Sequence, residues 1–186
     1  LAWFAKAGLP VAAAGLINRA VVYPDTESAR RAISEIFRIE ARKTPDTFGG
    51  TVKGKTLHLT SEKGFHQSWT KLYPDRPWNR KSYRSLVVHE LAHQAHARLS
   101  LARTGSEETM GPSWFFEGLA VMCAGQFAEG EKPMTAVQIL SHVGEGKTPK
   151  VSYPLYGRLV RSLALLVPVK SLVEAAADPN FPRNLL

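Results

Sequence analysis

The sequence has little cysteine and no long apolar run. Cys123 is the only cysteine among 186 residues, so the chain can form no internal disulfide and no zinc site built from several cysteines. The longest apolar stretch, residues 1–17, is broken by Lys6, Pro10 and two glycines, and it falls short of the roughly 20 apolar residues that a bilayer needs. We therefore expect no transmembrane segment. Because the chain begins at Leu1 without an initiator Met, we expect that an upstream segment has been removed or was never built. A signal peptide is neither visible nor excluded, so the sequence does not assign a compartment.

No residue type dominates, and no internal repeat is present. Hydrophobic residues make up 44% and charged residues 22%, which is typical of globular proteins and argues against disorder or a fibrous repeat. The length suits one hydrophobic core. We expect a single domain over residues 1–186.

Positive charge is in excess. There are 24 Lys and Arg residues against 16 Asp and Glu, a formal net charge of +8 that favours anionic partners. The basic residues gather in two clusters, Arg38, Arg42 and Lys43, and then Arg76, Arg80, Lys81 and Arg84. Four aromatic residues interleave the second cluster: Trp69, Tyr73, Trp78 and Tyr83. No known nucleic-acid-binding module accompanies them, so we expect no nucleic-acid partner, while an anionic surface stays open as a partner of the basic patches.

The first third of the chain predicts a helix followed by a small sheet. Residues 1–23 indicate a short helix or strand. A helix is expected from Pro24, capped by Asp25 or Thr26, with apolar residues at three-to-four spacing as far as residue 41. Thr44-Pro45-Asp46 should end it, and Gly49-Gly50 should turn the chain. The alternation over 51–61, with Leu57 and Leu59 on one face, predicts strand, with a hairpin across Lys53-Gly54-Lys55.

The rest of the chain predicts helices. Residues 64–81 carry two prolines and no periodicity, and we interpret them as a structured loop. Helices are expected over 82–101, 114–128, 135–143 and 152–167, with a shorter one after Pro168 that ends near residue 178. The fold class is therefore α+β, with a helix and small sheet over about 1–65 and a mainly helical half over about 82–186.

The predicted helix over 82–101 contains a group of residues typical of metal-binding sites. His89-Glu90-Leu91-Ala92-His93 places two imidazoles four residues apart, one above the other on a helix face, where both can bind one ion. Glu90 lies about 100° around the helix from His89, close enough to act as a general base on a metal-bound water. Leu86, Val87 and Val88 precede the motif. Burying ionisable groups in so apolar a helix is costly unless a cation compensates them.

Zinc is the metal that this set of side chains favours. Two neutral imidazoles and one carboxylate match the three protein ligands of a catalytic zinc site, so a third ligand is needed. His96 is unsuited, because seven residues of helix rise about 10 Å. Glu117 is preferred, since it should lie at the start of the next helix beside Gly118, which permits close helix approach. Glu107, Glu108 and His96 are the alternatives to Glu117 as the third ligand. If Glu117 has only a structural role, it is an acid that stabilises the positive, N-terminal end of the helix dipole.

These residues resemble a family, the gluzincin metallopeptidases. Trp114-x-x-Glu117-Gly118-x-Ala120 after the HExxH helix is similar to the WxxEGxA segment of the M1 aminopeptidases and of the smaller peptidase-MA-like domains. The resemblance covers about residues 55–165. It implies a zincin-like fold and one zinc per chain held by His89, His93 and Glu117. The smaller domains are often bacterial, which gives a slight preference for a bacterial protein outside the cytoplasm.

The resemblance also implies a reaction. Glu90 would take a proton from a zinc-activated water that attacks a peptide carbonyl. Tyr156, then Tyr153, then His142 are the candidates for the oxyanion donor. The strand through Leu57 and Leu59 resembles the edge strand along which zincins bind an extended peptide or protein substrate.

Two sequence features depart from larger relatives of that family. No GxMEN-like segment is present, which favours an endopeptidase over an aminopeptidase. Ala120 and Val121 stand where thermolysin-type enzymes carry an Asp, so partners of the two histidines stay unassigned.

Two other functions compete with the peptidase. One is a basic binding domain whose zinc site is structural or inactive. The other is binding to nucleic acid or to an anionic cell envelope through the net charge of +8, in which case the His89–His93 motif has no function of its own.

Overall fold

The computed structural model describes residues 1–40, 43, 47–143 and 149–186. The chain contacts divide into two compact units, residues 14–90 and residues 1–13 with 91–186. Each unit is described by itself below. The single domain over 1–186 stays a prediction.

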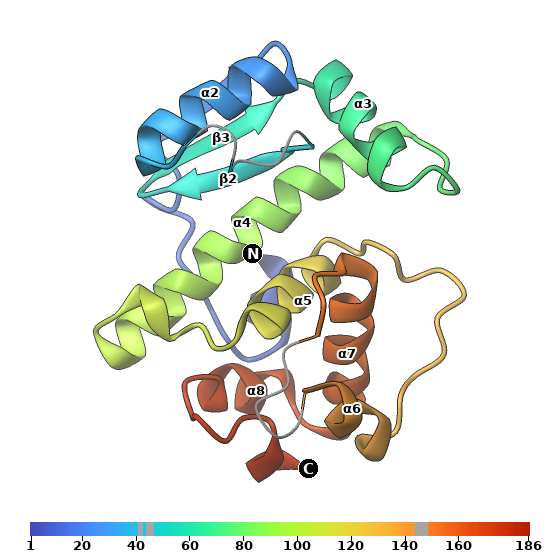
Figure 1. Cartoon of the computed structure of the whole chain (residues 1–186). Coiled ribbons are helices and arrows are strands. Elements are labelled where there is room, and N and C mark those ends of the chain that lie inside the picture. The colour runs from blue at the N-terminus through green and yellow to red at the C-terminus, as the bar shows by residue number, and fades with distance from the viewer. Residues whose placement is uncertain (41–42, 44–46, 144–148) are drawn as a thin grey trace. The chain divides into compact units, whose positions relative to one another are not determined.

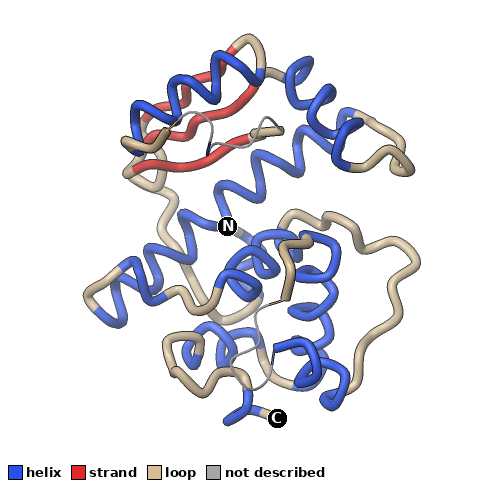
Figure 2. Tube along the Cα trace, viewed as in Figure 1, coloured by secondary structure: helices blue, strands red, loops and turns tan. Residues whose placement is uncertain are grey.

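The unit of residues 14–90 contains a three-stranded sheet. Its strands are β1 (Arg19–Tyr23), β2 (Gly50–Lys53) and β3 (Thr56–Thr60), in the order β1-β3-β2, and they lie side by side in Figure 2. β1 pairs with β3 in parallel, and β2 pairs with β3 antiparallel with Gly50 opposite Leu59. Gly54 has φ +58°, the left-handed conformation that a tight hairpin turn requires. The predicted hairpin is confirmed.

Leu57 and Leu59 lie on the central strand of this sheet. Both are buried, as their alternation predicted, but β3 is paired with β1 along one side and with β2 along the other. A strand paired on both sides has no free backbone N–H and C=O groups to offer an added strand. The prediction that these two residues mark an edge strand is therefore wrong; within this hairpin β2, the strand before the turn, is the edge.

Helices accompany the sheet in this unit. α2 (Thr26–Phe37) begins at Asp25, whose carboxylate accepts a hydrogen bond from the Ser28 N–H at 2.7 Å, and it lies along the sheet in Figure 1. It ends before residue 41, with Arg38 in the left-handed conformation at φ 54°. The predicted stop at Thr44-Pro45-Asp46 lies outside the described residues.

The expected loop over 64–81 is wrong for its first half. α3 (Glu62–Leu72) occupies that stretch and begins where the Ser61 hydroxyl accepts a hydrogen bond from the Gly64 N–H. Phe65, Ser68 and Trp69 are buried at helical spacing, so an apolar face does exist there. Glycine suits residue 64 because a Cβ there would meet Thr60 and Asp25, so the position has no room for a side chain.

The other unit is built from helices and loops in its described part. α4 (Arg80–Thr104) starts in the first unit and continues into this one from residue 91. It has no Gly or Pro and is longer than the predicted 82–101. The other elements of this unit are α1 (Ala2–Lys6), η2 (Glu107–Thr109), α5 (Ser113–Cys123), α6 (Ala136–Val143), α7 (Tyr153–Leu166), α8 (Val169–Ala175) and η3 (Arg183–Leu185). Across the described residues, no helix combines the length and apolarity that a membrane crossing needs.

α5 and α7 pack at close range because each carries a glycine at the contact. A Cβ at Gly118 would overlap the Tyr156 carbonyl oxygen, and a Cβ at Gly157 would overlap Val121. The expectation that Gly118 permits close helix approach is confirmed. Phe115, Leu119 and the other buried side chains of α5 pack into one core with α7.

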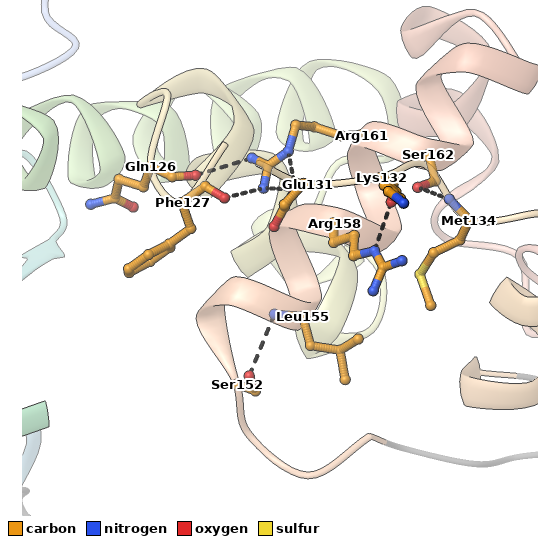
Figure 3. A network of polar contacts seen from close by, with 10 residues as sticks. All are labelled: Gln126, Phe127, Glu131, Lys132, Met134, Ser152, Leu155, Arg158, Arg161 and Ser162. Atoms are coloured by element: carbon orange, nitrogen blue, oxygen red, sulfur yellow. Dashed lines mark hydrogen bonds and ion pairs between the residues drawn. The ribbon is translucent and has the colours of Figure 1, made fainter. Parts of the chain in front are cut away.

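The loop after α5 is fastened to α7 by two arginines (Figure 3). Arg161 forms an ion pair with Glu131 and donates hydrogen bonds to the carbonyl oxygens of Gln126 and Phe127 at 3.1 and 3.3 Å. Arg158 donates to the Lys132 carbonyl oxygen at 2.9 Å. These bonds hold the loop after α5 against α7.

Candidate metal centre

His93 and Glu117 meet directly. The His93 Nε2 atom lies 3.2 Å from a Glu117 carboxylate oxygen, and both side chains are mostly buried, at 18% and 23% exposure. The Phe116 ring packs edge-on against the His93 imidazole, with ring centroids 5.8 Å apart. Two side chains from different helices thus present a nitrogen and an oxygen to the same point.

His89 joins this pair from one helical turn earlier on α4. His89, His93 and Glu117 each offer one ligand atom, and these atoms all lie within 4.8 Å of one another. His89 is buried. The group could bind a metal ion, as the spacing of His89 and His93 and the choice of Glu117 predicted.

The donor set fits a divalent transition metal. Two ligands bound at about 2 Å to one tetrahedral zinc lie about 3.3 Å apart, and the His93 to Glu117 separation is 3.2 Å. Imidazole nitrogen with carboxylate oxygen suits zinc and its neighbours in the first transition row.

Glu117 lies one residue further into its helix than the sequence suggested. α5 begins at Ser113 with Pro112 as the N-cap residue, so Glu117 is the fifth residue and falls in the second turn. The effect of a helix dipole on an acid fades beyond the first turn. The interpretation of Glu117 as a dipole-stabilising acid is correspondingly weak.

Glu90 is held between its helix and the sheet of the same unit. Its side chain is 7% exposed. A Cβ built on Gly50 would lie 3.1 Å from the Glu90 Cγ atom, so this carboxylate stem runs past the first residue of β2. Sequence reasoning missed Gly50, because Gly49-Gly50 reads as a turn when the neighbouring helix is unknown.

The predicted oxyanion donors lie at three places in the helical unit. Tyr156 is buried to 1% exposure, and its hydroxyl donates to the Pro149 carbonyl oxygen at 3.0 Å. Burial raises the pKa of Tyr156, and the nearby negative charge of Glu117 raises it further. Tyr153 is the first residue of α7 and is half-buried, and His142 lies in the last turn of α6.

A cleft elsewhere in the unit is separate from this group. It has a volume of about 360 Å³ and is lined by Met122, Glu131, Lys132, Arg158 and neighbours, with none of His93, Glu117 and Tyr156 among them. It belongs to the loop that Arg161 fastens. The group of His89, His93 and Glu117, which could bind a metal ion, does not coincide with this cleft.

No known protein family, curated protein or solved structure matches this chain.

Proposed function

We propose that this chain is a zinc-dependent peptidase of the gluzincin type, with an α+β zincin-like fold. The observation that carries the proposal is the group of His89, His93 and Glu117, with Glu90 beside His89 on the same helix. A purely structural metal site has no use for a carboxylate placed to activate water. A hydrolytic site needs one.

Zinc held by the three side chains would polarise a substrate carbonyl and acidify a water molecule. Glu90 accepts a proton from that water at its carboxylate and delivers it to the leaving amine. Burial of Glu90 restricts its motion. It also excludes bulk water from one side of the carboxylate, which strengthens its interactions there.

The oxyanion donor is a tyrosine of α7. Exposure favours Tyr153, because it is half-buried whereas Tyr156 is only 1% exposed. Tyr153 stands at the helix start, where its side chain is half-buried. The assignment to Tyr153 or Tyr156 is tested below.

The substrate is a peptide segment in extended conformation. With β3 paired on both sides, β2 takes over the role proposed for the edge strand. β2 contains Gly50, which lies against Glu90, so a peptide paired along β2 would run past the general base. An endopeptidase is favoured over an aminopeptidase because the sequence has no GxMEN-like segment.

The experiment compares zinc-loaded wild-type protein with Glu90→Gln on a mixture of unstructured peptides. The amide cannot accept a proton, so Glu90→Gln should keep its zinc and melting temperature and lose at least about 10²-fold in kcat/KM. A chelated wild-type sample is the second control. Equal hydrolysis by both zinc-loaded proteins would remove Glu90 from the reaction.

A basic binding domain with a structural or inactive zinc site is the second candidate, favoured by the net charge of +8. Binding to an anionic polymer or surface would weaken steeply with salt and would not need zinc. Peptide hydrolysis would need zinc and respond far less to salt.

A further inference from the structure

Gly50 occupies a position where a side chain has no room. A Cβ built there would lie 2.9 Å from Leu59 Cδ2, 3.1 Å from Glu90 Cγ and 3.3 Å from the His58 carbonyl oxygen. Real Cβ atoms essentially never approach another heavy atom within 3.0 Å. The Glu90 stem passes close to Gly50, through space that a side chain at residue 50 would partly fill.

The backbone at Gly50 does not itself require glycine. Among the described residues, the glycines with positive φ are Gly8, Gly15, Gly54, Gly105, Gly111, Gly125 and Gly130, and Gly50 is not one of them. Glycine inside a strand weakens the strand and often marks a place where another group comes close. Here the close group is the proposed general base.

We propose that Gly50 is a positioning residue for Glu90. The inference rests on the proposed role of Glu90 as the proton acceptor. A methyl group at residue 50 would push the Glu90 Cγ atom aside by a few tenths of an ångström, and the carboxylate at the end of the stem would move further. Small misplacements of reacting groups lower the rate more than they lower substrate binding.

Gly49 supplies a matched control. A Cβ there would lie 2.8 Å from Phe65 Cε2 and 3.1 Å from Leu86 Cδ1, and Gly49 also lacks a positive φ. Gly49→Ala and Gly50→Ala therefore introduce the same methyl group with similar overlap in the same unit. The methyl at residue 50 meets Glu90, whereas the three atoms nearest to a methyl at residue 49 belong to Phe65 and Leu86.

The first measurement compares zinc content, melting temperature and peptide hydrolysis of the two variants. Both should keep one zinc and lose about 2–4 °C or more in melting temperature through overpacking. Only Gly50→Ala should lose about 10-fold or more in kcat, with KM nearly unchanged. Equal losses of kcat in both variants would overturn the inference.

The second measurement needs no activity. In a double-mutant cycle of melting temperatures, Glu90→Ala removes the Cγ atom, so it should reduce the loss caused by Gly50→Ala and leave the loss caused by Gly49→Ala unchanged. If the losses of melting temperature in Gly50→Ala and Glu90→Ala were simply additive, the inference that Gly50 positions Glu90 would be overturned, while the proposed peptidase function would not be affected. A wild-type protein that binds zinc and cleaves no peptide would instead contradict the peptidase function, and with it any catalytic role of Gly50.

Discussion

His96 is a buried histidine whose two ring nitrogens have no hydrogen-bond partner among the described residues. It is 1% exposed, and its ring lies edge-on to Phe115 with centroids 5.9 Å apart. Burial lowers the pKa of His96 from 6.5 to about 3, and the positive charges of His93 and Arg103 act in the same direction. The folded chain therefore keeps this imidazole neutral.

Acid should weaken the fold through His96. Below about pH 6.5 the unfolded chain binds a proton at this residue and the folded chain does not until about pH 3, so the free energy of unfolding falls across that window as pH drops. Urea unfolding of metal-free wild type and His96→Leu, at about pH 7.5 and pH 5, measures the effect. The wild type should lose up to about 2 kcal/mol more than the variant.

The same variant carries its own check at neutral pH. Leucine removes two buried nitrogens that lack partners, so His96→Leu should be as stable as wild type or more stable at about pH 7.5. Equal acid losses in the two proteins would contradict the assigned protonation state.

The two tyrosines of α7 should separate in a kinetic comparison. Tyr153→Phe should lower kcat by about 10² with zinc content and KM little changed, as expected for a donor used in the transition state. Tyr156→Phe should instead lower stability by about 1 kcal/mol, because it leaves the Pro149 carbonyl oxygen without its donor. A large kcat loss in Tyr156→Phe with none in Tyr153→Phe would exchange the two roles.

At the scale of helices, Gly118 controls how closely α5 approaches α7. Alanine is intrinsically better in a helix by about 1 kcal/mol, yet Gly118→Ala should destabilise the protein by about 2 kcal/mol or more, since the new methyl would overlap the Tyr156 carbonyl oxygen. Glu117 is the adjacent residue, so zinc affinity should fall too. Calorimetric titration with zinc and thermal unfolding measure both effects.

Gly157→Ala is the control for that prediction. Its methyl would overlap Val121 in the same interface but stands further along the chain from Glu117. It should destabilise the protein to a similar extent with a smaller change in zinc affinity. Unchanged stability in Gly118→Ala would show that the close approach is not needed.

Elements with a strong local signal could be predicted from the sequence. α4 has apolar periodicity without Gly or Pro, and Gly54 marks the hairpin turn. α3 was missed, because Gly64 and its charged neighbours hide an apolar face that packing reveals. The central position of β3 could not be predicted, since a hairpin does not indicate on which side a third, distant strand will pair.

Across the whole molecule, some residues of the candidate site have a local sequence signal and others are brought together only by tertiary packing. The histidine pair follows from helix geometry alone, and Glu117 was chosen because it should lie at the start of the next helix beside Gly118. Gly50 lies forty residues from Glu90 in the chain, and no pattern links them. Contacts of this kind depend on tertiary packing, which local sequence does not encode.

The most direct test of the central claim is the zinc content of the purified chain and of four variants, measured by elemental analysis after dialysis. We predict one zinc per wild-type chain and about the same in Glu107→Ala, whose side chain is exposed. His89→Ala, His93→Ala and Glu117→Ala should each lose most of it, because three protein ligands are needed for tight binding. Full zinc occupancy in Glu117→Ala, or no zinc in the wild type, would contradict the account.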